Sequence, residues 1–380
     1  MGDVLVVGGG IFGVTAALEL AARGERVALH EAGPLPHPDA ASTDISKVVR
    51  MDYGRDAFYV ELMEQALPRF RAWNRESGRA LFVETGFCML TARKMSPDGF
   101  EGASYDYLAE RGHRLERLDG ATLAARQPSW RQGRFVDGYL NPVGGWAPSG
   151  KVVAWLAERA REAGVTVVEH SPLHAIERDG GRVVALELGE ERLEADRFVI
   201  AAGAATPSLV VETAPFLRAT AQPIFHFAPE DPRAFADLTV WAADIATTGW
   251  YGFPPNEDGI IKVANHGPGL AYDTPATWDV METRCRDFLR DSLPALAEAP
   301  IVTRRICRYC DSLDGDLWID RVPETDNLFV AAGGSGHAFK LAPMLGEIIA
   351  DVVLGAQAWP RFAWREPGTG NEAARAVSPG

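Results

Sequence analysis

Asp3-Val-Leu-Val-Val-Gly-Gly-Gly-Ile-Phe-Gly13 is the first of two stretches that indicate the fold of this chain. The second, Arg26-Val-Ala-Leu-His-Glu31, follows after an apolar helical stretch. The apolar run before the first glycine is typical of a strand buried on both faces. Gly8, Gly10 and Gly13 then match the pattern G-x-G-x-x-G. This pattern allows a tight turn, a close approach of the backbone to a pyrophosphate, and close packing of helix on strand.

The helix after Gly13 is expected to end near Gly24, and its N-terminus is a site for an anion. Glu31 ends the second strand, 18 residues after Gly13, where a carboxylate accepts the hydroxyl protons of an adenosine ribose. Strand, turn, helix, strand and acid together predict a dinucleotide-binding unit. An acid at this point favours FAD or NAD over NADP.

Composition limits the class of protein. A length of 380 residues allows two domains that share an interface. A net charge of −14 argues against nucleic acid or an anionic membrane as a partner. No apolar run reaches the ~20 residues that span a bilayer. Because the nucleotide motif starts at residue 3, we expect no cleavable leader ahead of it. Four cysteines do not form a disulfide framework. We expect a cytoplasmic monomer.

Periodicity along the chain predicts alternating helices and strands. Residues 33–38 and 141–149 are expected to be loops, because proline and glycine interrupt them. The stretch 42–50 opens like a capped helix. Further helices are expected at 56–75, 105–111, 151–163 and 342–354, strands at 82–91, 165–169, 183–188, 197–202 and 327–332, and a strand-rich region at 222–308.

A second glycine loop, Gly333–Gly336, must return beside the first glycine loop to complete the sheet. The fold class is therefore α/β, with a discontinuous Rossmann-type nucleotide-binding domain and an inserted substrate domain of mostly antiparallel sheet. The nucleotide-binding domain is expected to comprise 1–80, 142–220 and 315–365. The substrate domain is expected to comprise 81–141 and 221–314, and a disordered tail 366–380.

Three segments carry a resemblance to a known family. The G-x-G-x-x-G unit, Ala202-Gly203 and Phe329-Val-Ala-Ala-Gly-Gly-Ser-Gly-His-Ala-Phe-Lys340 together resemble the D-amino-acid-oxidase superfamily of flavoproteins. The chain is most similar to the monomeric sarcosine oxidase branch, which includes N-methyltryptophan and pipecolate oxidases, amadoriases and saccharopine oxidases. The resemblance covers residues 3 to about 355. It implies that the dinucleotide is FAD and not NAD.

The resemblance also implies how the flavin is held. Cys307 matches a cysteine that links covalently to the flavin 8α-methyl group. Cys310 is expected only to pack in the protein interior. A zinc site is not expected at Cys307-x-x-Cys310, since no second pair follows, and no other metal site is predicted. The other cofactor-binding residues are expected to be Gly8, Gly10, Ile11, Phe12, Gly13, Glu31, Ser42, Thr43, Lys47, Ala202, Gly203, Gly333, Gly334, Gly336, His337 and Lys340.

For the reaction itself, the resemblance implies a set of catalytic and binding side chains. Arg50 and Lys340 match a pair that holds a substrate carboxylate, for which arginine is suited. Lys262 matches a lysine that activates O2; from the residues alone, a solvated lysine on an edge strand is the alternative. His266, Tyr251 and Tyr309 match residues that line the active-site pocket of the family. Lys47 completes this set of catalytic and binding side chains.

Lys47 is the main departure from the sarcosine oxidases, which carry arginine at this position. The stretch 42–50 is more similar to amadoriases and saccharopine oxidases, and favours a substrate larger than sarcosine. The predicted function is FAD-dependent oxidation of the C–N bond of an N-substituted amino acid or secondary amine, with O2 as acceptor and H2O2 as product. The alternatives are a dehydrogenase that uses a quinone or carrier protein, an imine-forming oxidase in a biosynthetic pathway, and a non-catalytic nucleotide-binding scaffold.

Overall fold

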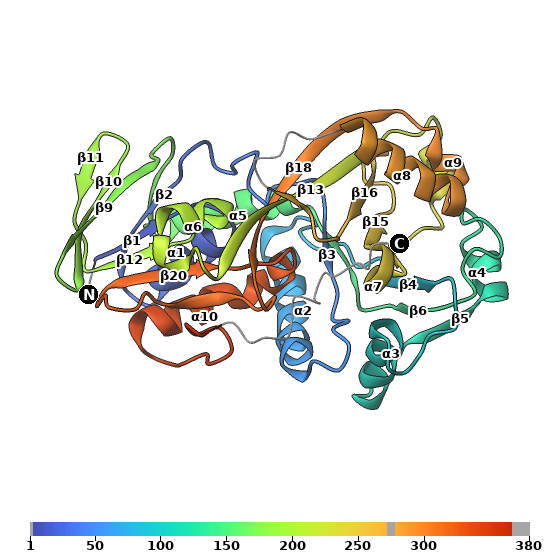
Figure 1. Ribbon diagram of the computed structural model, residues 1–380, viewed down its shortest axis with the longest axis horizontal. Helices are drawn as coiled ribbons and strands as arrows, with labels where there is room; N and C mark the ends of the chain where they lie inside the picture. Colours follow the sequence, from blue (N-terminus) through green and yellow to red (C-terminus); the bar gives the residue numbers. More distant parts are fainter. Residues whose placement is uncertain (1–2, 272–277, 367–380) are drawn as a thin grey trace.

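The computed structural model describes residues 3–271 and 278–366, and within them the predicted Rossmann unit forms one side of a six-stranded sheet (Figure 1). Strand β1 lies between β2 and β12, and all three are parallel. Strand β20 pairs in parallel with β12, so the two glycine loops leave the same edge of the sheet. The order is β19 (Trp318–Arg321), β20 (Leu328–Ala332), β12 (Arg197–Ile200), β1 (Asp3–Val7), β2 (Arg26–His30) and β8 (Thr166–Val168).

This sheet is covered on both faces, as the apolar run of β1 predicted. Val4 and Val6 pack in one core with the helices, while Leu5 and Val7 pack in another with a small antiparallel sheet. Alternate residues of a strand point to opposite faces, so each needs an apolar partner. The helices are α1 (Ile11–Ala22), α2 (Ala57–Ser77), α5 (Ser149–Glu162) and α10 (Ala342–Leu354); the small sheet is β9 (Leu173–Asp179), β10 (Arg182–Leu188) and β11 (Glu191–Leu193).

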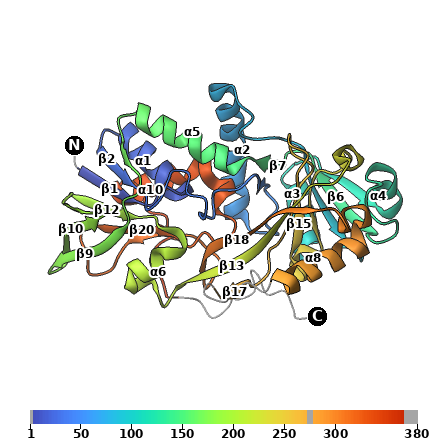
Figure 2. The same ribbon diagram turned by 90° about the horizontal axis from the view of Figure 1, so that it is seen from above.

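A second, larger sheet stands beside the first, and the long strands β13 and β18 run between the two (Figures 1 and 2). Helix α8 packs its buried side on this sheet. Its strands are β17 (Leu270–Ala271), β13 (Leu217–Phe227), β16 (Ile261–Asn265), β15 (Trp250–Gly252), β14 (Val240–Ala243), β4 (Phe87–Thr91), β6 (Asp137–Asn141) and β5 (Glu116–Asp119), with β18 (Ile301–Ser312) on β13. Its other helices are α3 (Phe100–Glu110), α4 (Gly120–Arg126), α7 (Ile245–Thr248) and α9 (Pro294–Ala297), whereas the one-turn helix α6 (Thr206–Leu209) lies beside the first sheet (Figure 1).

The fold class is confirmed, and two local predictions are wrong. The stretch 42–50 is not a helix, because Lys47–Val49 forms strand β3 and pairs with β7, Gly145–Ala147, inside a predicted loop. Helix α8, Trp278–Ser292, interrupts the strand-rich region. Both errors concern segments whose conformation is set by distant partners.

The predicted bounds of the two domains stay a prediction. Strand β13 runs across the predicted domain boundary between residues 220 and 221. The predicted disordered tail lies outside the described residues except for Glu366. Among the helices within 3–271 and 278–366, none has the length and apolar content needed to cross a membrane.

Candidate active site

A cavity of about 380 Å³ opens at the edge of the first sheet where both glycine loops leave it. It runs from Glu31, at the end of β2, to the loop after β20. Most of its lining comes from four chain segments, 7–12, 31–42, 201–205 and 332–339. Of the predicted cofactor-binding residues it is lined by Gly8, Gly10, Ile11, Phe12, Glu31, Ser42, Lys47, Ala202, Gly203, Gly334 and Gly336.

The first glycine loop leaves no room for side chains. Gly8 has φ +101°, and a Cβ on it would lie 2.5 Å from the carbonyl oxygen of Ala201. A Cβ on Gly13 would lie 1.8 Å from the carbonyl oxygen of Gly8. Only glycine permits this approach of helix α1 to the turn, so the loop presents bare backbone to the cavity.

Two side chains fix the ends of this loop. The Oε2 of Glu31 accepts a hydrogen bond from the Gly9 N–H at 2.6 Å. The Oγ of Ser42 accepts from the N–H of Ile11, the first residue of α1, at 3.2 Å. The carboxylate of Glu31 keeps further lone pairs for a ligand, since each oxygen accepts more than one bond. Glu31 and Ser42 thus shape the cavity and line it.

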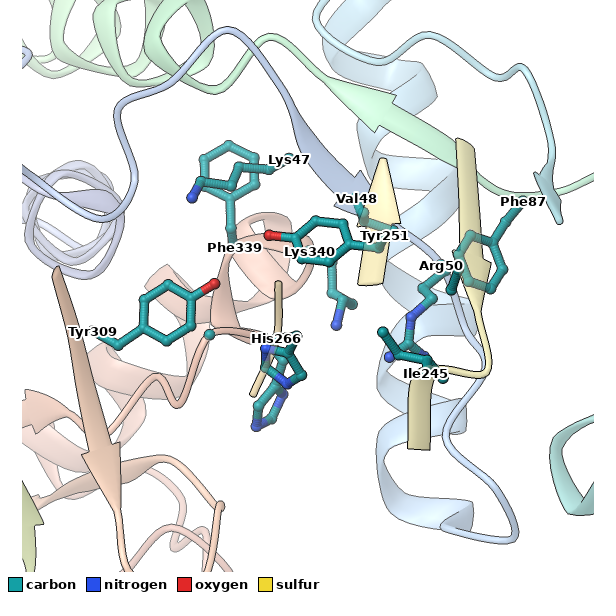
Figure 3. A pocket seen from close by; sticks show the side chains of 13 residues that line it. Lys47, Val48, Arg50, Phe87, Ile245, Tyr251, His266, Tyr309, Phe339 and Lys340 are labelled. Atoms are coloured by element: carbon teal, nitrogen blue, oxygen red, sulfur yellow. The ribbon is translucent and has the colours of Figure 1, made fainter. Parts of the chain in front are cut away.

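A smaller cavity of about 70 Å³ adjoins the large one (Figure 3). Lys47, Tyr309, Gly336 and Phe339 line both cavities, so the two meet there. Its other walls come from several elements of both parts of the fold. They are Phe87 on β4, Ala242 on β14, Tyr251 on β15, His266 after β16, Ile245 on α7, Val48 on β3, and Arg50, His337 and Lys340.

Two cations, Arg50 and Lys340, face this small cavity. The Nη1 of Arg50 is buried and has no hydrogen-bond partner among the described residues. Burial lowers the pKa of Lys340 well below that of an ordinary lysine, and the charge of Arg50 lowers it further. Asp52 is the nearby anion, but its carboxylate accepts from Tyr139 Oη at 2.6 Å. An incoming anion would therefore find positive charge and a free donor.

Tyr53 connects Lys340 to His337. Its hydroxyl accepts a hydrogen bond from Lys340 Nζ at 3.2 Å and lies 3.1 Å from His337 Nδ1. His337 Nε2 lies 2.8 Å from the Gly315 carbonyl oxygen, which only accepts, so Nε2 donates and Nδ1 accepts from Tyr53. Burial raises the pKa of Tyr53, which keeps its proton in place. Lys340 and His337 are thus held in fixed positions at the cavity.

The aromatic side chains stand opposite Arg50. The hydroxyl groups of Tyr251 and Tyr309 point toward one another across the cavity (Figure 3). Burial raises the pKa of Tyr251 above that of an ordinary tyrosine. His266 lies beside Tyr309, with the ring centroids 6.3 Å apart. This wall offers hydroxyl and imidazole groups over an otherwise apolar surface.

Lys262 is fully buried but lines neither cavity. Its Nζ donates to Asp44 Oδ2 at 2.6 Å and to the Ser46 carbonyl oxygen at 2.6 Å. Strand β16 lies inside the sheet, between β13 and β15, so the alternative of a solvated lysine on an edge strand is wrong. Burial lowers the pKa of Lys262 to about 8, against the attraction of Asp44, which raises it.

Cys307 is likewise fully buried and lines neither cavity. Its Sγ accepts a hydrogen bond from Lys47 Nζ at 3.3 Å, and Lys47 lines both cavities at their junction. Cys310, three residues on, does line the large cavity. Burial raises the pKa of the Cys310 thiol to about 12, so this cysteine stays protonated at neutral pH.

The structure thus brings most of the predicted residues together and leaves a few outside the linings. Gly13 and Gly333 belong to the glycine loops, and Thr43 follows Ser42 in the chain; none of these three lines a cavity. Sequence reasoning missed Asp44, Asp52 and Tyr53. All three lie in or directly after the stretch that carries Lys47 and Arg50, which was the available signal.

Comparison with known proteins agrees with this geometry. The family model described as DAO, FAD dependent oxidoreductase, matches residues 3–352. The chain is 29% identical to the peroxisomal sarcosine oxidase of Mus musculus, over 93% of this chain and 92% of that protein. It is 26% identical to the L-saccharopine oxidase of Schizosaccharomyces pombe, over 97% of this chain and 94% of that protein.

Among solved structures, the fructosyl amine:oxygen oxidoreductase (amadoriase I) of Aspergillus fumigatus is similar, with a TM-score of 0.79. It is 26% identical to this chain, and the match covers 99% of this chain and 91% of that one. The similarity therefore extends over both sheets and the cavities between them.

Proposed function

The chain belongs to the DAO family of FAD dependent oxidoreductases, and on this premise we propose that it oxidises the C–N bond of a small N-substituted amino acid. The observation that carries the proposal is the small cavity, which holds two cations and opens into the dinucleotide cavity at Lys47 and Tyr309. The relatives named above act on sarcosine and L-saccharopine, both N-substituted amino acids.

FAD fits the residues of the large cavity. The bare backbone of Gly8 and Gly10 suits a pyrophosphate at the N-terminus of α1. The carboxylate of Glu31 suits the ribose hydroxyls. Gly334 and Gly336 line the end of the cavity that meets the small cavity. FAD supplies a two-electron acceptor for the C–H bond next to nitrogen.

The proposed overall reaction is R–CH2–NH–R′ + O2 + H2O → R–CHO + R′–NH2 + H2O2. Two electrons and two protons leave the carbon and nitrogen of the donor, O2 receives them, and water supplies the carbonyl oxygen. Two of the relatives are named as oxidases and one as an oxygen oxidoreductase, which supports O2 as the acceptor here.

Arg50 and Lys340 are the groups we assign to the substrate carboxylate. The unused Nη1 of Arg50 and the ammonium of Lys340 face the same cavity. A charge-assisted hydrogen bond from each would fix the carboxylate. The amine would then lie on the side of Tyr251, Tyr309 and His266, which is open toward the dinucleotide cavity. This orientation places the carbon to be oxidised near the junction of the two cavities.

The size of the small cavity supports a small substrate. A cavity needs roughly 10–15 Å³ to hold one water molecule. A volume of about 70 Å³ therefore suits a molecule with few atoms beyond a carboxylate and a methylated amine. Phe87, Ala242 and Ile245 close the apolar side. A larger substrate, which Lys47 favoured on sequence grounds, would have to extend out of this cavity.

Lys262 and Cys307 complete the proposal. We assign Lys262 to the reaction with O2, because a buried ammonium favours the superoxide formed when O2 takes an electron. We assign Cys307 to a thioether with the flavin, supported by its contact with Lys47 at the junction of the cavities. The monomeric state and the cytoplasmic location stay predictions of the sequence.

The function is tested by measuring O2 uptake and H2O2 release with paired compounds. N-methylglycine and N-methylalanine are expected to be oxidised with one H2O2 for each O2, whereas dimethylamine, which lacks the carboxylate, is not. Equal rates with and without a carboxylate would contradict the assigned substrate class. Turnover with a quinone but without O2 would favour the dehydrogenase.

A further inference from the structure

Asp44 is a carboxylate with a fully buried side chain on which basic groups from three adjacent strands converge. Lys262 lies on β16, His226 on β13 and Arg305 on β18. Within the sheet, β13 pairs with both other strands, and His226 stands directly opposite Lys262. The arrangement therefore gathers groups that are distant in sequence at one point.

The contacts of Asp44 divide between its two oxygens. Oδ2 accepts from Lys262 Nζ at 2.6 Å. Oδ1 accepts from the N–H of Ile45 at 2.7 Å, lies 3.2 Å from His226 Nε2, and lies 3.7 Å from Arg305 Nη1. These bonds hold the carboxylate in one orientation, and its pKa lies well below the usual range despite burial, chiefly because of Lys262.

Asp44 also belongs to the loop that builds the cavities. It lies between Ser42, which holds the first residue of α1, and Lys47, which lines the junction of the two cavities. The Nη1 of Arg305, which lies near Asp44 Oδ1, also donates a hydrogen bond to the carbonyl oxygen of the preceding residue, Thr43. The large sheet is thus fastened to the cavity loop through Asp44.

An uncompensated ammonium is costly to bury, and Lys262 is entirely removed from solvent. The neighbouring Lys47 disfavours its charge further. Among the described residues, Asp44 is the carboxylate paired with Lys262. The charge of the ammonium therefore depends chiefly on this carboxylate, while the Ser46 carbonyl oxygen accepts its second hydrogen bond at 2.6 Å.

We propose that Asp44 is a positioning residue for the oxidative half of the reaction, which holds the Lys262 ammonium charged and fixed against the cavity loop. The inference rests on the proposed role of Lys262. O2 takes two electrons from the reduced cofactor and two protons to form H2O2, and its first reduction product, superoxide, is an anion that a nearby cation stabilises. Asp44 touches neither the substrate nor O2 and acts through Lys262.

The charged and titratable groups that face Lys262 are Asp44 and Lys47 from the cavity loop and Cys307 from β18. His226 and Arg305 face it through Asp44. With Asp44 in place, the pKa of Lys262 is about 8. Removing a close opposite charge lowers a lysine pKa by roughly 1–3 units. A fall of about two units would take the charged fraction at pH 7 from about nine-tenths to about one-tenth.

The test follows reoxidation of the substrate-reduced holoenzyme by O2 in a stopped-flow instrument between pH 5.5 and 9.5. In the unchanged protein the rate should fall as pH rises past about 8. Asp44→Asn should move this fall to lower pH and slow reoxidation about tenfold at pH 7. In the Lys262→Met background, Asp44→Asn should add no further loss. Asp44→Glu keeps the charge but displaces the carboxylate. It should slow reoxidation without changing the pH at which the rate decreases.

The matched control is Asp311→Asn, which removes another fully buried carboxylate from the same sheet, bonded to Thr220. It should leave the pH profile in place. A slower rate in Asp44→Asn with an unmoved profile, or an unchanged rate, would overturn the inference. If Asp44→Asn does not fold, an unchanged reoxidation rate in Asp44→Glu would overturn it. Unchanged reoxidation in Lys262→Met would instead defeat the role proposed for Lys262.

Discussion

The Nζ of Lys47 lies 3.3 Å from the Sγ of Cys307 and donates a hydrogen bond to it. The contact joins β3 to β18 and brings a cation to a fully buried cysteine. The same Sγ donates to the carbonyl oxygen of Ala41 at 3.7 Å, so Cys307 is held between two groups of the cavity loop. Cys310 lines the large cavity, and burial raises the pKa of its thiol to about 12. The two cysteines should therefore differ in their chemistry toward the flavin.

We predict that Cys307→Ala releases its flavin when the protein is denatured in acid, whereas the unchanged protein keeps the yellow colour in the precipitate. Lys47→Met should also release flavin, because the Sγ of Cys307 loses the hydrogen-bond donor that positions it at the junction of the cavities. Cys310→Ala is the control and should keep the flavin attached. Release from Cys310→Ala but not from Cys307→Ala would show that the tether is assigned to the wrong cysteine.

Substituting either cation of the small cavity should weaken substrate binding. Arg50→Met and Lys340→Met each remove a charged hydrogen bond worth about 1.5–3 kcal/mol, which corresponds to a rise in KM of about 10- to 150-fold. The measurement is the KM for N-methylglycine. Arg55→Met, which removes an exposed arginine paired with Glu110, is the control and should change KM less than about twofold. Unchanged KM in both variants would place the carboxylate elsewhere.

The depressed pKa of Lys340 predicts how carboxylate binding depends on pH. Only protonated Lys340 attracts the carboxylate, so affinity should decline as pH rises through its pKa. Because burial and Arg50 lower that pKa, the decline should come well below pH ~10.4, where an ordinary lysine loses its charge. Propionate, which has no amine of its own, is the probe, and its inhibition constant is the measurement. An affinity that stays constant up to about pH 10 would contradict this prediction.

Ile245 should set the upper size of the substrate. It lines the apolar side of the small cavity on the one-turn helix α7, between the left-handed residues Asp244 and Gly249. Ile245→Ala should raise kcat/KM for N-methylvaline relative to N-methylglycine by about tenfold or more. The same ratio in Val136→Ala, an exposed position, is the control. A ratio that does not change would show that substrate size is limited elsewhere.

Much of the first sheet could be predicted from sequence because its signals are local. The glycine spacing from Gly8 to Gly13 and the apolar run of β20 each predict their own conformation, and helix α10 begins and ends at the predicted residues. The stretch 42–50 could not be predicted in this way. Its serine and aspartate resemble a helix cap, but Asp44 binds Lys262, 218 residues away, and Lys47–Val49 pairs with β7.

The candidate site shows the same division. The side chains expected from motifs, such as Arg50 and Lys340, do meet in one cavity. Tyr53 and Asp52 escaped notice because nothing near them in sequence reveals their partners: Tyr53 binds Lys340, and Asp52 binds Tyr139. Lys262 was expected beside the flavin, yet its described contacts are with Asp44 and Ser46. Partners of this kind follow from tertiary packing.

The central claim, FAD-dependent oxidation of a small N-substituted amino acid, is tested most directly by anaerobic mixing of the purified holoenzyme with N-methylglycine or N-methylalanine. The absorbance at about 450 nm, where oxidised flavins absorb, should disappear with at least one of them. Admitting air should restore it with one H2O2 for each flavin. A flavin that no N-substituted amino acid bleaches would contradict the account.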